Sequence, residues 1–241
     1  MQQEPMKTIG VLGGMGPMAT VNLAQAIVEN TLARCDQDHP PVIIDSNTRI
    51  ADRTAFLLGL STQDPRPEIL AAAARLENAG VACMVMPCNT AHAFYPDIVA
   101  ATRAEVIHMI EETAKWIATT FPTQKKIGVL ATQGTYRADV YGRGLAKFGL
   151  IQIVPDQRGQ EEVTRLIYDG IKANNLAYDY TGYDQAVARF RAEHNLEVVI
   201  LGCTELSVAQ RLHPLGGTFV DPLRVIARVL IEKAGGRVTS W

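Results

Sequence analysis

Two similar stretches of this chain are the strongest indication of its fold: Val81-Ala82-Cys83-Met84-Val85-Met86-Pro87-Cys88-Asn89-Thr90 and Val198-Val199-Ile200-Leu201-Gly202-Cys203-Thr204-Glu205. In each stretch a short apolar run ends at Pro or Gly, and a cysteine and polar residues come next. The apolar run predicts a buried strand, and the polar residues favour the start of a helix. The same unit of strand, cysteine and helix therefore occurs twice.

Other segments are repeated as well. Residues 9–16 (IGVLGGMG) match residues 127–134 (IGVLATQG), and residues 106–110 have a weaker echo in 219–223. Units that recur in the same order at a near-constant separation indicate two similar halves. Strands alternate with helices in both, so the predicted fold class is α/β, with two pseudo-symmetric domains that each contain a short parallel sheet flanked by helices. If the halves face each other, Cys88 and Cys203 meet across one cleft.

The sequence pattern also predicts the individual elements. The predicted strands are 8–12, 42–45, 83–86, 106–110, 127–131, 151–154, 197–201 and a short segment near 219, and the predicted helices are 19–32, 68–78, 91–101, 111–119, 136–148, 161–173, 184–193, 205–211 and 223–234. Pro17 suits the first position of its helix, and Gly80 suits the stop after another. Ligands of parallel sheets lie at the carboxyl ends of the strands, where both cysteines are placed.

Composition excludes several classes of partner. The 241 residues are 47% apolar and 20% charged, with 23 basic and 25 acidic side chains. Because the charges nearly balance, the chain has no strong positive electrostatic field that would attract nucleic acid or anionic lipid. Residues 1–5 lack the pattern of a secretory leader, and no apolar run approaches the roughly 20 residues of a membrane helix. We therefore expect a cytoplasmic protein that binds neither nucleic acid nor membrane.

The four cysteines do not form a disulfide framework, because their spacing is irregular and a reducing cytosol keeps them as thiols. Cys88 and Cys203 hold matched positions, each before a predicted helix, where free amides and the helix dipole lower the pKa of a thiol. We predict that these two are catalytic and that Cys35 and Cys83 are structural. His92 lies one helical turn after Cys88, but no fourth ligand with zinc spacing follows, so no metal is expected.

The turns after the first strand of each half are candidate ligand sites. Gly14 and Met15 belong to a GxGxxA pattern, and Asp45 ends the next strand, as in a dinucleotide fold. The equivalent turn of the second half holds Thr132 and Thr135, whose hydroxyls and amides suit a carboxylate as well as a phosphate. A tight turn without ligand and a nucleotide-binding module are the alternatives to a substrate site.

Two basic residues occupy matching places in the halves. Arg53 and Lys172 each follow the second strand region, and together they can hold two carboxylates of one small ligand. Two thiols on opposite sides of such a ligand suit removal of a proton from one face of a carbon acid by one thiolate and delivery of a proton to the other face by the second thiol. Amides and hydroxyls of Asn89, Thr90 and Thr204 are placed to stabilise the developing carbanion. No lysine has a Schiff-base context, so pyridoxal phosphate is not implied.

These motifs resemble a known family. Residues 9–17, Asp52-Arg53-Thr54, residues 86–92 and Gly202-Cys203-Thr204-Glu205 closely resemble the aspartate/glutamate racemase superfamily, and within it the aspartate racemases. The resemblance covers essentially the whole chain. It implies a racemase without a cofactor that interconverts L- and D-aspartate, with the site between two domains, and commonly a homodimer. It also implies that Cys88 and Cys203 are the acid–base pair.

The resemblance carries further implications for the halves and the site. Arg53 and Lys172 match residues assigned to substrate carboxylates, and a C-terminal helix that returns to the first half gives domains of 1–111 plus 222–241 and 112–221. Glu205 either assists the ionisation of a thiol or stabilises the helix dipole. Glutamate or a broader set of amino acids stays open as substrate. So does a thiol enzyme of the maleate isomerase or arylmalonate decarboxylase kind.

Overall fold

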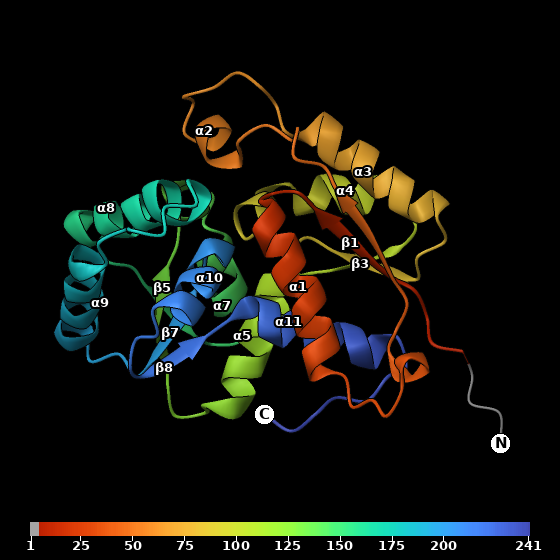
Figure 1. Cartoon of the computed structure of the whole chain (residues 1–241). Coiled ribbons are helices and arrows are strands. Elements are labelled where there is room, and N and C mark those ends of the chain that lie inside the picture. Colours follow the sequence, from red (N-terminus) through yellow and green to blue (C-terminus); the bar gives the residue numbers. More distant parts are fainter. Residues whose placement is uncertain (1–4) are drawn as a thin grey trace.

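The computed structural model describes residues 5–241 and contains two parallel sheets of four strands each (Figure 1). The first has the order β2-β1-β3-β4 and the second β6-β5-β7-β8, so the two halves share one topology. The strands are β1 (Ile9–Gly13), β2 (Val42–Ser46), β3 (Cys83–Val85), β4 (Glu105–Ile107), β5 (Lys126–Leu130), β6 (Ile151–Ile153), β7 (Val198–Leu201) and β8 (Thr218–Val220). The predicted fold class is confirmed. The structure describes none of residues 1–4. The prediction that no leader is present and the predicted first residues of the first domain both involve these residues, so they lie outside the described part of the chain.

Helices cover both sheets. They are α1 (Pro17–Asn30), α2 (Arg53–Leu57), α3 (Arg66–Asn78), α4 (Tyr95–Ala101), α5 (Met109–Thr120), α6 (Gln133–Arg137), α7 (Val140–Ala146), α8 (Gln157–Arg165), α9 (Thr181–His194), α10 (Thr204–Leu212) and α11 (Pro222–Lys233). Shorter or irregular helical segments are η1 (Asp36–Asp38), η2 (Thr90–Phe94) and η3 (Leu166–Lys172), of which η3 is a π-helix. Pro17 opens α1, and Gly80 follows α3 with a φ of 78°, both as predicted.

Three helices that the sequence predicts as continuous are divided. The segment 91–101 is a 3-10 turn, η2, followed by α4, whose first turn contains Pro96 and therefore needs no amide hydrogen there. The segment 136–148 is divided into α6 and α7 at Asp139, which has a φ of 49°. The segment 161–173 begins earlier, at Gln157, because Asp156 accepts a hydrogen bond from the Gly159 amide, and it changes into η3 at Leu166.

The last helix packs against the first half of the chain. Leu223, Ile226 and Leu230 of α11 lie in one buried cluster with Leu23 and Ile27 of α1, and Figure 1 shows the two helices side by side. In the same way, α5 follows the last strand of the first sheet but packs into the core beside α7. Each sheet is therefore covered partly by a helix that follows the other sheet's last strand. The division into 1–111 plus 222–241 and 112–221 stays a prediction.

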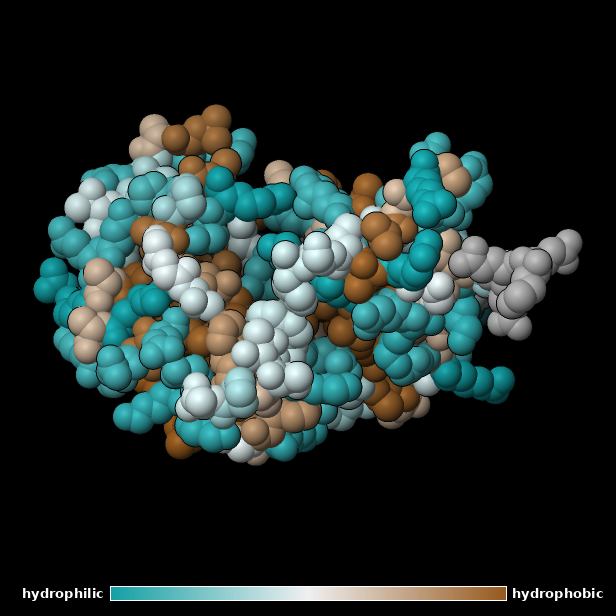
Figure 2. Space-filling model, turned by 90° about the horizontal axis from the view of Figure 1, so that it is seen from below, coloured by the Kyte–Doolittle hydropathy of each residue, from teal (hydrophilic) through white to brown (hydrophobic). Residues whose placement is uncertain are grey.

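The surface carries mixed polarity. Figure 2 shows one face on which hydrophilic side chains predominate and many of the hydrophobic ones are recessed between them. Within residues 5–241, no helix combines the length and the apolar character needed to span a membrane.

Candidate active site

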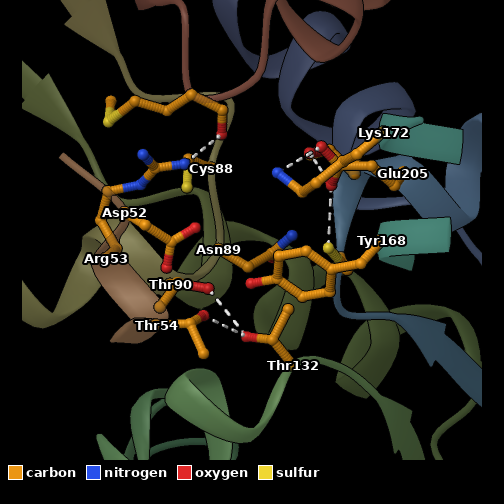
Figure 3. A pocket seen from close by; sticks show the side chains of 13 residues that line it. Asp52, Arg53, Thr54, Cys88, Asn89, Thr90, Thr132, Tyr168, Lys172 and Glu205 are labelled. Carbon is orange, nitrogen blue, oxygen red and sulfur yellow. Dashed lines mark hydrogen bonds and ion pairs between the residues drawn. The ribbon is translucent and has the colours of Figure 1, made fainter. Parts of the chain in front are cut away.

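Cys88 and Cys203 line the same pocket, although they follow different sheets. Cys88 lies after β3, and Cys203 is the residue that precedes the first turn of α10 after β7; each is less than 10% exposed. The pocket has a volume of about 300 Å³ counted to its opening. Its lining consists of Met15, Asp52, Arg53, Thr54, Cys88, Asn89, Thr90, Thr132, Tyr168, Lys172, Cys203, Thr204 and Glu205 (Figure 3).

Two of the predicted site residues lie outside this lining. The Gly14 amide donates to Thr20 Oγ1 at 2.8 Å; its φ is 87°, and the absence of a side chain lets the backbone pass close to Asn47. Thr135 Oγ1 lies 2.8 Å from Thr90 Oγ1. Thr135 thus contacts a residue of the pocket, Gly14 shapes the turn before Met15, and the other predicted site residues line the pocket.

Three lining residues were missed by the sequence analysis. Asp52 and Thr54 flank Arg53, and Tyr168 lies one helical turn before Lys172, with the Lys172 Nζ 5.6 Å from its ring centroid. Proximity in sequence to the two basic residues was the available signal. Asp52 opens α2, a helix absent from the predicted elements, by accepting a hydrogen bond from the Ala55 amide at 2.7 Å.

The segments that follow the two cysteines differ. Cys203 directly precedes the nine-residue helix α10, whereas Cys88 is followed by the five-residue 3-10 segment η2. A helix dipole needs several aligned peptide units, so the predicted effect of a helix N-terminus applies to Cys203 and only weakly to Cys88. The prediction of two equivalent helix starts is therefore wrong for Cys88, because Pro96 delays the α-helix until Tyr95.

A buried carboxylate lies beside Cys203. The Cys203 thiol donates a hydrogen bond to Glu205 Oε2 at 2.9 Å, and Lys172 Nζ lies 3.1 Å from Glu205 Oε1. Burial raises the pKa of Cys203 well above its usual range; Glu205 raises it further, while Lys172 opposes the rise. Burial works against the charge of Lys172, but Glu205 and the two cysteines outweigh it and raise the pKa of Lys172. This geometry holds Cys203 as a thiol.

Cys88 lies beside a guanidinium instead. Arg53 is 9% exposed, and its Nη1 donates to the carbonyls of Ile50 and Ala51 at 3.2 and 3.0 Å, while Nη2 donates to that of Met15 at 3.3 Å. Burial disfavours the charge of Arg53, but Cys88, Asp52 and Glu205 together raise its pKa. Arg53 Nε has no hydrogen-bond partner among residues 5–241, so a buried donor is available to a ligand.

Hydroxyl groups join the halves below the two cysteines. Thr132 Oγ1 lies 3.2 Å from Thr54 Oγ1 and 3.1 Å from Thr90 Oγ1, so residues from both halves form one network (Figure 3). A side chain at Gly134 would collide with Thr54, whose Cα would lie 2.7 Å from the added Cβ. The close approach of α2 and α6 therefore requires glycine there.

The Asn89 side chain is oriented from behind the pocket. The hydroxyl of Tyr141, which is fully buried, donates to Asn89 Oδ1 at 2.6 Å. Burial raises the pKa of Tyr141 well above its usual range, so the hydroxyl keeps its proton. Asn89 Nδ2 has no partner within the described chain and is therefore a second buried donor.

His92 is not placed as a metal ligand with the cysteines. Its Nδ1 lies 2.9 Å from the Cys88 carbonyl oxygen, and its Nε2 accepts a hydrogen bond from the Met109 amide at 3.2 Å. Burial and the neighbouring His108 lower the pKa of His92 to about 3. A neutral imidazole with both nitrogens engaged joins the Cys88 segment to α5. In the described part of the chain, no group of three or more His, Cys, Asp or Glu side chains is arranged to hold a metal.

The whole-chain pattern matches one protein family: its sequence model, described as Asp/Glu/Hydantoin racemase, aligns with residues 12–230. The chain belongs to this racemase family. A curated relative, the broad specificity amino-acid racemase RacX of Bacillus subtilis, is 29% identical over 205 residues, which are 83% of this chain and 86% of RacX.

Solved racemase structures share the fold. The aspartate racemase of Picrophilus torridus gives a TM-score of 0.81 at 26% identity, covering 97% of this chain and 96% of that one. A glutamate racemase of Francisella tularensis in complex with D-glutamate gives a TM-score of 0.66 at 19% identity, over 95% of this chain and 81% of that one, and shows likeness of fold alone. The racemase family and the fold that the sequence motifs predicted are thus confirmed.

Proposed function

We propose that this racemase interconverts L- and D-aspartate with Cys88 and Cys203 as its two acid–base groups. The observation that carries the proposal is the placement of both cysteines in one buried pocket, at equivalent strand ends of the two sheets. Figure 3 shows Cys88 and Arg53 on one side of the pocket, and Glu205 and Lys172 on the other. A small carbon acid between them has one thiol group available on each face.

We assign the starting roles in the proposed reaction from the different surroundings of the cysteines. Cys203, whose thiol donates to Glu205, is the acid, and Cys88, beside the Arg53 guanidinium, is the base. Cys88 removes the α-proton, and the electron pair of the broken C–H bond passes into the substrate carboxylate. Cys203 then donates its proton to the opposite face of Cα. The enzyme is left with a Cys88 thiol and a Cys203 thiolate, which is the form that catalyses the reverse reaction.

The buried donors suit the charge that develops during this transfer. Asn89 Nδ2 and Arg53 Nε are buried and have no partner among residues 5–241, so a substrate carboxylate can accept hydrogen bonds from them without displacing other contacts. Such preorganised donors stabilise the enolate-like intermediate more than the ground state, because its carboxylate carries more negative charge.

Charges around the pocket favour a dicarboxylic amino acid. Arg53 and Lys172 are the two cations of the lining, and Asp52 and Glu205 are its two carboxylates. Aspartate brings two carboxylates for the cations and one ammonium group for a carboxylate. The resemblance to RacX, a broad specificity amino-acid racemase, makes glutamate and neutral amino acids the substrates to compare with it.

The deciding experiment follows optical inversion and deuterium incorporation at Cα together, with reduced protein in deuterated water and no added cofactor. L-aspartate, L-glutamate and L-alanine are supplied separately. We expect inversion with deuterium at Cα, fastest for aspartate. If L-alanine were turned over faster than L-aspartate, the proposal of aspartate as the preferred substrate would be wrong. The absence of exchange from all three amino acids would refute amino-acid racemisation at this pocket.

Cysteine variants test the proton transfer itself. Cys88→Ala and Cys203→Ala are expected to abolish inversion, whereas Cys35→Ala, which changes an exposed cysteine, is the matched control and retains it. Exchange of the α-proton without inversion in one of the single variants would locate the base for that enantiomer. Full racemisation by Cys203→Ala would refute the two-base scheme.

A further inference from the structure

A second and larger hollow lies behind helix α10. It has a volume of about 1430 Å³, part of which is open to solvent, and α1, α10, β8 and α11 surround it. Figure 1 shows α1, α10 and α11 side by side at the centre of the molecule. The first turn of α10 faces the cysteine pocket with Thr204 and Glu205, whereas Ser207, Gln210 and Arg211 line the hollow. The two cavities are therefore separate.

The hollow is lined by charges of both signs. Arg211 and Arg224 supply the positive charges, and Asp221 and Glu29 the negative ones. Burial raises the pKa of Asp221, while hydrogen bonds from Ser207 and Leu223 and the charges of Arg211 and Arg224, which line the same hollow, oppose that rise. Equal numbers of opposite charges suit a zwitterion better than a simple anion or cation.

Polar atoms of this lining are only partly satisfied. Ser207 Oγ and the Leu223 amide both donate to Asp221 Oδ1, at 2.7 and 2.9 Å, and across residues 5–241 no hydrogen bond reaches Oδ2. Asn22 is 6% exposed; its Oδ1 accepts from Arg211, and its Nδ2 has no partner among the same residues. A buried donor without a partner is costly unless a ligand or water satisfies it. One acceptor and one donor are thus available beside Arg211.

The remaining wall is apolar and aromatic. Leu201, Val220 and Val225 line it, together with Trp116 and Trp241, whose rings lie 4.6 Å apart between centroids. The chain contains only these two tryptophans, and neither lines the cysteine pocket. The tryptophans are therefore a fluorescent reporter of this hollow alone.

We propose that this hollow is a second ligand site that binds a free α-amino acid with an apolar side chain. Asp221 Oδ2 accepts from the ammonium group, and Arg211 with Asn22 Nδ2 binds the carboxylate. The apolar side chain packs against the wall that contains Trp116 and Trp241, where it is removed from water. The site is independent of the chemistry proposed for the two cysteines.

Tryptophan fluorescence tests the proposal, with L-leucine and L-phenylalanine as probes. The experiment uses the full chain with Cys88→Ala, so that no turnover changes the probe. We expect a saturable change in emission for both amino acids. Isovalerate and isoamylamine, which keep the apolar group but carry only one of the two charges, are expected to bind at least about tenfold more weakly, because each lacks one charge-assisted contact.

Two variants separate this site from the cysteine pocket. Asp221→Asn retains a residue that can begin α11, so folding is preserved, and it is expected to weaken L-leucine binding about tenfold or more. Arg211→Gln should have a similar effect, while Arg158→Gln on the exposed face of α8 should have none. Unchanged binding in both Asp221→Asn and Arg211→Gln, or no saturable response to either amino acid, would overturn the proposal.

Discussion

The proximity of Glu205 to Cys203 gives a quantitative prediction for Glu205→Gln. The carboxylate accepts the Cys203 thiol hydrogen bond at 2.9 Å, and both side chains are less than 10% exposed. Because a nearby negative charge disfavours the thiolate, removing that charge must lower the pKa of Cys203. Lys172, which opposes the raised pKa of Cys203, is also released from its ion pair with Glu205 and strengthens the effect.

The magnitude of this shift follows from electrostatics. Two unit charges about 4 Å apart interact by about 4 kcal/mol at an effective dielectric constant near 20, which corresponds to about three pKa units. The glutamine amide retains part of the hydrogen bond, so we expect the pKa of Cys203 to fall by about one to two units. The sign is fixed: the Cys203 thiolate forms at a lower pH in the variant.

Alkylation measures this shift directly. In a Cys88→Ala background, the rate of iodoacetamide reaction at Cys203 is followed against pH by mass spectrometry of its peptide, since the thiolate is the reacting species. Adding Glu205→Gln should move the midpoint to lower pH. Adding Glu193→Gln, which changes an exposed carboxylate of α9, should leave it in place. Equal midpoints with and without Glu205→Gln would show that the carboxylate does not control this thiol.

Three further variants probe other parts of the structure. Tyr141→Phe removes the hydrogen bond that orients Asn89, and it should lower kcat/KM about 2- to 10-fold; an unchanged kcat/KM would exclude the positioning role. Arg53→Gln should raise the KM for aspartate about 10- to 100-fold, more than for alanine, as steady-state assays of both substrates would show. Leu230→Ala leaves a cavity between α11 and α1, and it should lower the free energy of unfolding by about 2–5 kcal/mol in urea titrations, so a change below 1 kcal/mol would contradict the core assignment.

Local signals in the sequence located the strands and both cysteines, although β4 ends at Ile107 and not at residue 110 as predicted, because α5 begins at Met109. The apolar runs before Cys88 and Cys203 can only be buried, and Pro or Gly at their ends stops the strands there, so both residues were placed at strand ends without knowledge of distant contacts. Repetition of the unit then predicted that the halves match, and both sheets have the same strand order.

Local sequence signals did not predict where the helices are interrupted. The division of segment 136–148 depends on a left-handed backbone at Asp139. Aspartate tolerates this conformation, but nothing in the neighbouring sequence predicts it. Tyr168 and Thr54 line the pocket because η3 and α2 converge on it from different halves. The hydrophobic periodicity of a sequence describes one segment at a time, so it does not predict which distant segments come together.

Residue patterns along the chain were enough to predict a duplicated α/β fold with a cysteine at the equivalent strand end of each half. The unlike surroundings of the two cysteines emerge only when the chain is folded, with Arg53 beside Cys88 and the Glu205–Lys172 pair beside Cys203. Interactions between charges depend on distance and burial, and these are set when segments from the two halves come together. A repeat in sequence therefore specified where the thiols lie, while packing between the halves determined which charged groups lie beside each of them.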